Sequence, residues 1–174
     1  YNRMLSIKEQ LMQKVFFSHS LKSEKAIVTE IYERLESANV SIWSHYFDIP
    51  FRTNSDKAEK SALEHATHML VLLSKKGVKE KSSPISEQVK YAIENGKKIT
   101  VLQIDDISIP SEWGESYQLI PMLDRSKWAG QLLQLAAQLP KTIMDTVFSA
   151  LEDEKRFDEL LNILYSKPEW FGYS

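Results

Sequence analysis

Cysteine is absent from the 174-residue sequence, and its absence removes three kinds of chemistry. Without thiols there is no disulfide scaffold, no thiolate nucleophile and no thiolate metal ligand, which fits a reducing compartment. Long hydrophobic runs are missing as well: none approaches the roughly 18 residues that a membrane-spanning helix needs. The first residues also lack the basic and apolar pattern of a signal peptide. We therefore expect a cytoplasmic protein that is not embedded in a membrane.

An excess of charge of one sign is missing too. The 22 basic and 24 acidic side chains leave a net charge of -2. This balance creates no overall field toward nucleic acid or anionic lipid, so we expect neither as a direct partner. Hydrophobic residues at 43% and charged residues at 26% are typical of a soluble globular protein. The length suits one hydrophobic core.

Short apolar runs alternate with helical patterns along most of the chain. Each run is rich in β-branched, aromatic or leucine residues and stops at polar residues, which predicts buried strands. The five predicted strands are residues 14–17, 40–47, 69–73, 99–104 and 117–123. Pro121 cannot donate a hydrogen bond to a neighbouring strand, so the last strand belongs at an edge of the sheet.

Helical periodicity fills the segments between these strands. Helices are predicted after a Ser23 cap to Asn39, after a Ser55 or Asp56 cap to Ala66, from Pro84 after a Ser83 cap to Gly96, and from Trp128 to Leu139. In the third helix, Ile85, Val89, Ala92 and Ile93 form one apolar stripe. The polar stretch 75–82, which contains Gly77, is expected to be a loop.

Strands that alternate with helices imply right-handed crossovers and a parallel sheet covered on both faces. We therefore predict a flavodoxin-like open α/β sheet of about five strands in a domain that spans residues 1–139. Its first 13 residues are a helix or tail. Residues 140–174 are expected to form a helical extension that packs on or next to this domain.

Ligands of open parallel sheets bind beyond the carboxyl ends of the strands, because loops and helix amino termini converge there. Glu87 lies in the first turn of the third helix, about 200° around the axis from Ile85 at ~100° per residue. It therefore points away from the buried stripe. The candidate binding residues at this edge are Ser18, His19, Ser20, Tyr46, Phe47, Asp48, Ser74 and Ser83.

Structural roles compete with these functional ones. An acidic residue in a first helical turn complements the helix dipole without any catalytic role, and serines at strand ends commonly form turns. Trp43 and Phe47 share one face of the predicted strand and belong to the core, whereas Tyr46 faces the other side. Strand-end aspartates at this edge match no metal-binding motif, so we assign no metal.

Four segments, taken in order, resemble the Toll/interleukin-1 receptor (TIR) domain family over roughly residues 14–139. VFFSHS resembles the opening box of the family, and VSIWSHYFD resembles the strand that leads into its BB loop. HMLVLLSKKGVKEKSSPISEQVKYA resembles the family's strand, serine, loop and helix with a glutamate, and LIPMLDRSKWAGQLLQLAAQL is similar to its closing strand and helix. Two features depart from the family: Ser83 stands where many members have a tryptophan, and the loop after Asp48 lacks a glycine.

The resemblance implies a function. In TIR domains that cleave nicotinamide dinucleotides the equivalent helix glutamate is catalytic, which places that role on Glu87. NAD+ is then the substrate, with no cofactor required, and the products are nicotinamide and ADP-ribose or cyclic ADP-ribose. The resemblance further implies a bacterial type of immune or anti-phage signalling, with other TIR domains or further copies of this chain as partners.

Two other functions stay open. The domain can serve as a non-catalytic module that associates with itself or with another TIR domain through its BB-type loop, and Ser83 in place of tryptophan favours this. A nucleoside deoxyribosyltransferase-like enzyme shares the same sheet and also uses a glutamate on a sugar carbon.

Overall fold

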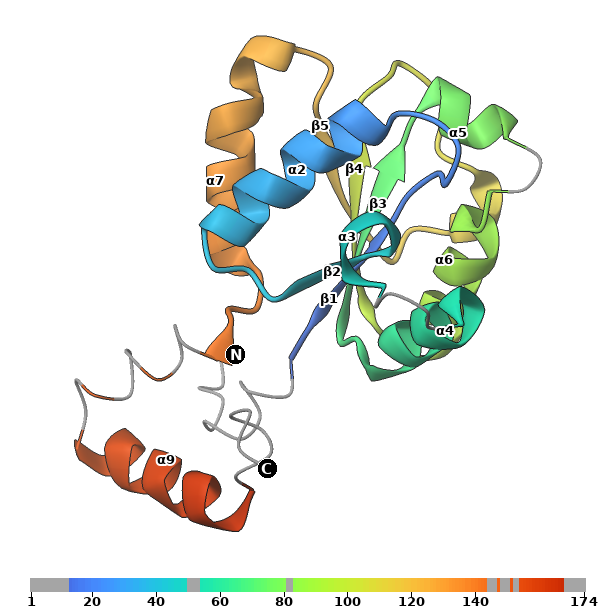
Figure 1. Ribbon diagram of the computed structural model, residues 1–174. Coiled ribbons are helices and arrows are strands. Elements are labelled where there is room, and N and C mark those ends of the chain that lie inside the picture. Colours follow the sequence, from blue (N-terminus) through green and yellow to red (C-terminus); the bar gives the residue numbers. More distant parts are fainter. Residues whose placement is uncertain are drawn as a thin grey trace.

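Five parallel strands form an open sheet in the computed structural model (Figure 1), which describes residues 13–49, 54–80, 83–143, 147, 151 and 154–167. The strands are β1 (Val15–Ser18), β2 (Ile42–Ser44), β3 (His68–Leu73), β4 (Lys98–Gln103) and β5 (Gln118–Pro121). Their order across the sheet is β2-β1-β3-β4-β5, and every neighbouring pair is parallel. This confirms the predicted flavodoxin-like sheet and the edge position of the last strand.

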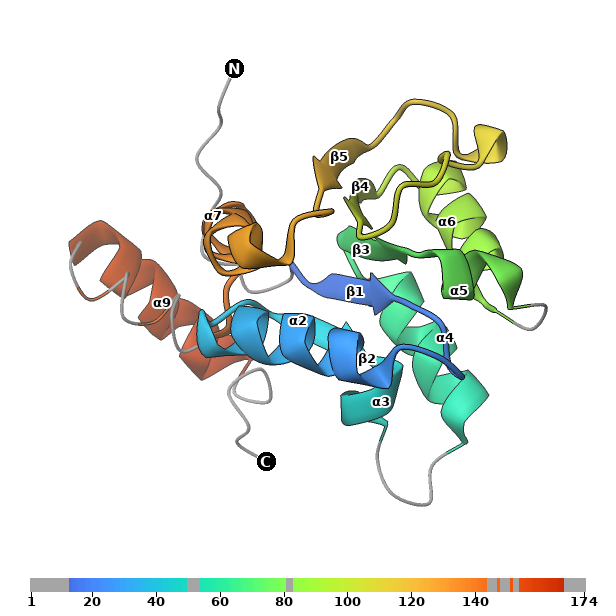
Figure 2. The same cartoon turned by 90° about the horizontal axis from the view of Figure 1, so that it is seen from above.

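Helices cover both faces of this sheet. The described helices are α2 (Lys25–Ser37), α3 (His45–Asp48), α4 (Ser55–His65), α5 (Lys75–Lys79), α6 (Ile85–Glu94), α7 (Trp128–Gln138) and α9 (Glu154–Ser166). Viewed from above, α2 and α7 lie on one side of the strands, and α4 and α6 lie on the other (Figure 2). Both layers follow from the right-handed crossovers that parallel neighbours require.

Side chains of the central strands point alternately to the two faces of the sheet, so the core has two halves. Val15 and Phe17 of β1 belong to the half that faces α2 and α7, whereas Phe16 belongs to the half that faces α6. Leu70 and Val71 of β3 separate in the same way. Because successive side chains point to opposite faces, a strand that is buried on both sides has to be apolar at every position. The continuous apolar runs of the sequence reflect this burial.

The second strand is shorter than predicted. The segment 40–47 was expected to be extended, but β2 ends at Ser44 and the chain turns into α3. Ser44 Oγ accepts a hydrogen bond from the Tyr46 amide at 3.3 Å, and the Asp48 carboxylate accepts one from the Ser44 amide at 2.8 Å. These local side-chain bonds satisfy the backbone in place of strand pairing.

Phe47 consequently leaves the sheet. It is 39% exposed and stacks on Tyr32 with ring centroids 4.4 Å apart, so its assignment to the core is wrong. Trp43 stays on the sheet and stacks on Phe16 at 5.1 Å.

The polar stretch after β3 contains a helix where a loop was expected. Ser74 begins α5 by accepting a hydrogen bond from the Gly77 amide at 3.0 Å. A Cβ at position 77 would lie 2.9 Å from Ser74 Oγ, so glycine allows this close approach inside the helix. Composition alone favours a loop because both glycine and lysine-rich segments are common there.

Three helix caps and the apolar stripe of α6 differ from the sequence predictions. Glu24 is the cap residue of α2. Asn54 caps α4, and α6 begins at Ile85 with Pro84 as its cap residue. On α6, Ile93 is 36% exposed, whereas Gln88 is only 7% exposed and takes its place on the buried face.

The C-terminal extension contributes α9, whose Leu160 and Ile163 are buried. How this extension packs on the domain stays a prediction. The N-terminal tail before residue 13 and the aromatic segment 170–173 lie outside the described residues.

The central position of β3 makes its leucines decisive for stability. We expect Leu70→Ala to lower the free energy of unfolding by about 2–5 kcal/mol, because Leu70 is fully buried and leaves a cavity. Leu133→Ala is the matched control, since Leu133 is 68% exposed, and should change stability by less than about 1 kcal/mol. Urea unfolding followed by circular dichroism measures both, and equal losses would contradict the assignment of β3 to the core.

Candidate functional site

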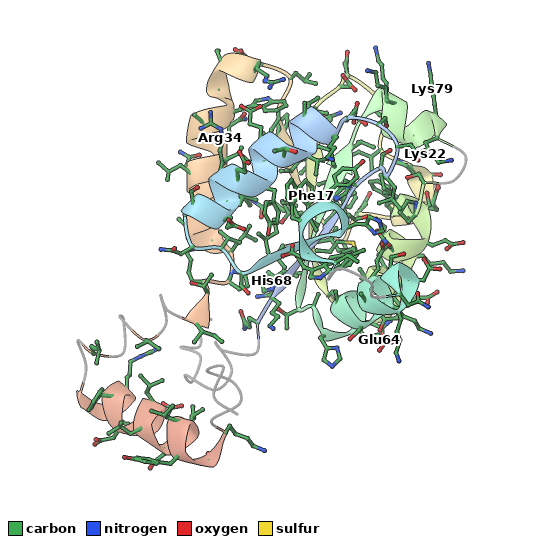
Figure 3. The ribbon with its side chains drawn as sticks, viewed as in Figure 1. Phe17, Lys22, Arg34, Glu64, His68 and Lys79 are labelled. Atoms are coloured by element: carbon green, nitrogen blue, oxygen red, sulfur yellow. The ribbon has the colours of Figure 1, made fainter. Side chains whose placement is uncertain are left out.

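The carboxyl ends of the three strands β2, β1 and β3 carry an unusual set of buried polar side chains. Ser18, His19, Ser20, Ser44 and Ser74 are at most 2% exposed, and Gln88 of α6, at 7%, lies beside them. Figure 3 shows Lys22 and Lys79 near this end of the sheet, whereas His68 and Glu64 lie toward the opposite end. Because buried polar groups require partners, the hydrogen bonds define what these side chains do.

His19 is held as a neutral imidazole. Its Nδ1 lies 2.8 Å from the Ser20 carbonyl oxygen, which can only accept, so Nδ1 carries the proton. Its Nε2 then accepts from Ser44 Oγ at 2.8 Å. Burial lowers the pKa of His19 to about 4, helped by the nearby charge of His45 and opposed by the bond to Ser20. His19 is therefore uncharged at neutral pH.

Ser20 is enclosed by neighbours. Its hydroxyl donates to the Glu80 carboxylate and lies 2.8 Å from Ser23 Oγ, while its carbonyl accepts from Tyr46 Oη at 3.0 Å. Burial raises the pKa of Tyr46, with further contributions from the negative charges of Glu80 and Glu24. Tyr46 thus remains a neutral donor that lies against His19, with ring centroids 4.7 Å apart.

Asp48 anchors the end of α3. One carboxylate oxygen accepts from the Ser44 amide, and the other accepts from Tyr32 Oη at 3.2 Å. Burial nevertheless raises the pKa of Asp48, and these two hydrogen bonds oppose the rise. Burial, followed by hydrogen bonding to Glu36, raises the pKa of Tyr32. Both contacts give Asp48 a structural role in this conformation.

The described strand-end residues pack tightly around His19 in this conformation. The gap bordered by His19, Leu21 and His45 is too tight to admit a water molecule. A ligand could contact Ser18, His19 or Ser20 only after neighbouring groups move. Their proposed binding roles, and that of Ser74 as the cap of α5, stay predictions.

Glu87 has a different environment. It is exposed in the first turn of α6, and no described residue forms a hydrogen bond or an ion pair with its carboxylate. It borders a depression of about 220 Å³ between α4 and α6. The depression is lined by Asp56, Glu59, Lys60, Leu63, Pro84, Glu87 and Gln88. The amino-terminal halves of two helices converge there, and their dipoles favour ionised carboxylates.

Sequence reasoning did not select Gln88, Glu59 and His45, which form a chain of hydrogen bonds near Glu87. Ser18 Oγ donates to Gln88 Oε1 at 2.6 Å, and Gln88 Nε2 donates to Glu59 Oε1. The second oxygen of Glu59 lies 2.5 Å from His45 Nδ1. One signal was available: Gln88 falls three residues after Ile85 on the buried face of α6, and a polar residue there needs a partner.

Ser83 and Phe47 form no hydrogen bond with this chain of residues. Ser83 Oγ accepts a hydrogen bond from the Ile85 amide at 3.4 Å, just before α6. Phe47 packs outward on Tyr32. Neither contact involves the depression beside Glu87, so their predicted ligand contacts remain untested.

This sequence and this fold can be compared with those of known proteins. The sequence matches the family model of the TIR domain over residues 15–136. The chain belongs to the TIR domain family. A comparison with curated proteins finds no match.

Two solved structures resemble this TIR domain. One is the TIR domain of a Toll-related receptor from Hydra magnipapillata, at 13% identity and a TM-score of 0.53, covering 71% of this chain and 97% of that one. The other is a 2-deoxyribosyltransferase from Bacillus psychrosaccharolyticus, at 11% identity and a TM-score of 0.54, covering 74% of this chain and 97% of that one. At these identities the likeness concerns the fold alone.

The described part of this TIR domain contains neither a cluster of metal-ligand side chains nor a helix that could span a membrane. No group of three or more histidine, aspartate or glutamate side chains there is arranged to hold a metal ion. No described helix combines the length and the hydropathy needed to cross a bilayer.

Buried neutral histidine should make this TIR domain sensitive to acid. His19 has a pKa of about 4 when folded and about 6.5 when unfolded. The unfolded state therefore binds more protons between these values, and stability falls as the pH drops from 6.5 toward 4. We expect His19→Gln to remove about 2 kcal/mol of the difference in unfolding free energy between pH 7 and pH 4.5.

The measurement is urea unfolding across this pH range. Burial also lowers the pKa of His68 to about 4, so some acid sensitivity should persist in the variant. His65→Gln, at an exposed histidine, is the control and should keep the full slope. An unchanged slope in His19→Gln would show that His19 is not held neutral.

Proposed function

We propose that this TIR domain is an NAD+ nucleosidase whose Glu87 acts at the bond between nicotinamide and ribose. The observation that carries the proposal is the environment of Glu87, an exposed carboxylate without a described partner in an acidic depression. Carboxylates without an ion pair or a capping contact in a concave site are available to a ligand.

The charges of the depression match the substrate's reacting end. Among the described residues that line the depression, Asp56, Glu59 and Glu87 carry negative charge and Lys60 carries positive charge. The nicotinamide ring of NAD+ is positively charged, so this negative potential attracts it. As the bond breaks, positive charge develops on the ribose carbon, and fixed carboxylates stabilise that centre.

The chemistry requires only what the depression offers. The C1′–N bond breaks, its electron pair moves to the ring nitrogen, and nicotinamide leaves as a neutral molecule without protonation. Glu87 stabilises or captures C1′ until water attacks and gives ADP-ribose, or an adenine nitrogen attacks and gives a cyclic product. A neutral nucleoside base is a poorer leaving group that benefits from a general acid, so the cationic substrate suits the site better.

The size of the depression also constrains the complex. At about 220 Å³ it lies below the roughly 300–1,000 Å³ of pockets for drug-sized ligands. It therefore holds the nicotinamide riboside end, and the rest of the dinucleotide extends over the surface or against a neighbouring copy. Assembly of several copies is the expected active form, as in many TIR enzymes.

A non-catalytic association module is the second candidate. Two observations favour it: the small depression, and Ser83, bonded to the Ile85 amide, where many family members carry an aromatic residue. Such a module would associate with TIR domains without turning over NAD+. Turnover therefore separates the two functions.

The test measures nicotinamide release from NAD+ by concentrated protein, with and without a crowding agent. We expect Glu87→Gln to reduce release by at least about 100-fold, because it removes the charge that stabilises the transition state. Glu94→Gln is the matched control, since Glu94 is an exposed glutamate in the last turn of the same helix, and it should keep full activity.

Three outcomes would reject this function. Equal release by wild type and Glu87→Gln removes Glu87 from the reaction. No release under any condition of assembly supports the association module. Transfer of deoxyribose from thymidine to adenine, without NAD+ cleavage, would identify the deoxyribosyltransferase activity.

A further inference from the structure

We propose that Glu59 recognises the 2′-hydroxyl of the ribose whose C1′ faces Glu87, so that the site selects ribosides over 2′-deoxyribosides. This inference rests on the proposed function and deepens it. Its starting point is the chain of hydrogen bonds that runs from β1 through α6 and α4 to α3.

The side-chain amide of Gln88 holds one carboxylate oxygen of Glu59, Oε1. Ser18 Oγ donates to Gln88 Oε1, and the Gln88 amide nitrogen therefore faces the Glu59 carboxylate. The reversed amide would place two acceptor oxygens against each other. Gln88 is 7% exposed and Ser18 is fully buried, so water cannot replace either contact readily.

His45 holds the other carboxylate oxygen of Glu59, Oε2. Its Nδ1 lies 2.5 Å from Glu59 Oε2 and donates a hydrogen bond to that oxygen. Because both oxygens are held from separate elements, the orientation of the carboxylate is set before a ligand binds. A preorganised acceptor loses little entropy on binding.

Glu59 retains the capacity to bind a hydroxyl group. An ionised carboxylate has about four lone-pair sites, and Gln88 and His45 use two of them. Its side chain is 16% exposed and borders the same depression as Glu87. The free lone pairs can thus accept from a ligand in that depression.

The covalent structure of a riboside connects these two carboxylates. The 2′-hydroxyl is on the carbon next to C1′, so a carboxylate close to Glu87 is placed to accept from it. Carboxylates are the usual acceptors for ribose hydroxyls in dinucleotide sites. A hydrogen bond to this hydroxyl also strengthens as positive charge develops in the transition state. Glu59 is thereby a specificity residue, and His45 and Gln88 are positioning residues.

The experiment compares kcat/KM for NAD+ with that for the analogue that has 2′-deoxyribose at nicotinamide. We expect Glu59→Gln to reduce the preference for ribose about 10- to 100-fold relative to wild type, the effect of losing a hydrogen bond to a charged group. Intrinsic reactivity of the two substrates cancels in this comparison. Thermal unfolding verifies that the variant is folded.

Asp56→Asn is the matched control. It removes one carboxylate from the same depression, but Asp56 belongs to no hydrogen bond of the Ser18–Gln88–Glu59–His45 chain. Both substrates should therefore lose activity in parallel, with the preference unchanged. If Glu59→Gln also lowers kcat/KM for both substrates equally, then Glu59 acts only through its charge. That result would overturn the inference.

Binding separates this inference from the proposed reaction. Calorimetry on Glu87→Gln measures the affinities of nicotinamide riboside and its 2′-deoxy analogue, and tighter binding of the riboside that disappears in Glu59→Gln/Glu87→Gln supports the role of Glu59. Equal affinities overturn that role, even where nicotinamide release depends on Glu87. Absence of NAD+ cleavage by the wild type with retained riboside selectivity overturns the reaction alone, and absence of both wild-type cleavage and riboside binding overturns both.

Discussion

Burial of β1 and β3 on both faces is the constraint on which the site depends. Parallel strands require crossovers, and the crossovers place α2 and α7 on one face and α4 and α6 on the other. Each helix that follows a strand begins near the carboxyl edge, so helix amino termini converge there. The core thereby determines where α4 and α6 bring Glu59 and Glu87 together. Packing of the core determines where the candidate site lies, and a few polar contacts determine which chemistry it offers.

The sheet could be predicted from the sequence because strands that are buried on both faces appear there as continuous apolar runs. The five apolar runs correspond to strands, and Pro121 marks the edge strand. The failures occur where side chains bond to the nearby backbone. Ser44 and Asp48 turn a β-rich segment into α3, and Ser74 starts α5 beside Gly77. Such bonds depend on single polar residues, and hydrophobic periodicity does not register them.

The candidate site was predictable in part for a similar reason. The direction of Glu87 follows from helical geometry alone, because it is measured from a buried neighbour on the same helix. Glu59 belongs to α4, which has few apolar residues, and nothing in its local sequence distinguishes it from other surface glutamates. Its partner Gln88 comes from another helix, so only the tertiary fold reveals the pair. The strand-end serines are the opposite case: their hydroxyls form hydrogen bonds within the protein, and their contacts with a ligand stay a prediction.

The Ser18–Gln88–Glu59 contacts also bear on how this sequence can change over evolution. Replacing Gln88 alone with an apolar residue would leave a buried hydroxyl and a carboxylate oxygen without donors or acceptors, which costs more than the bonds contribute. Replacing both Ser18 and Gln88 by apolar residues of similar shape removes that penalty for the hydroxyl. Related sequences should therefore keep these positions together or exchange them together. Their substitution history would then be correlated, although they lie 70 residues apart in the chain.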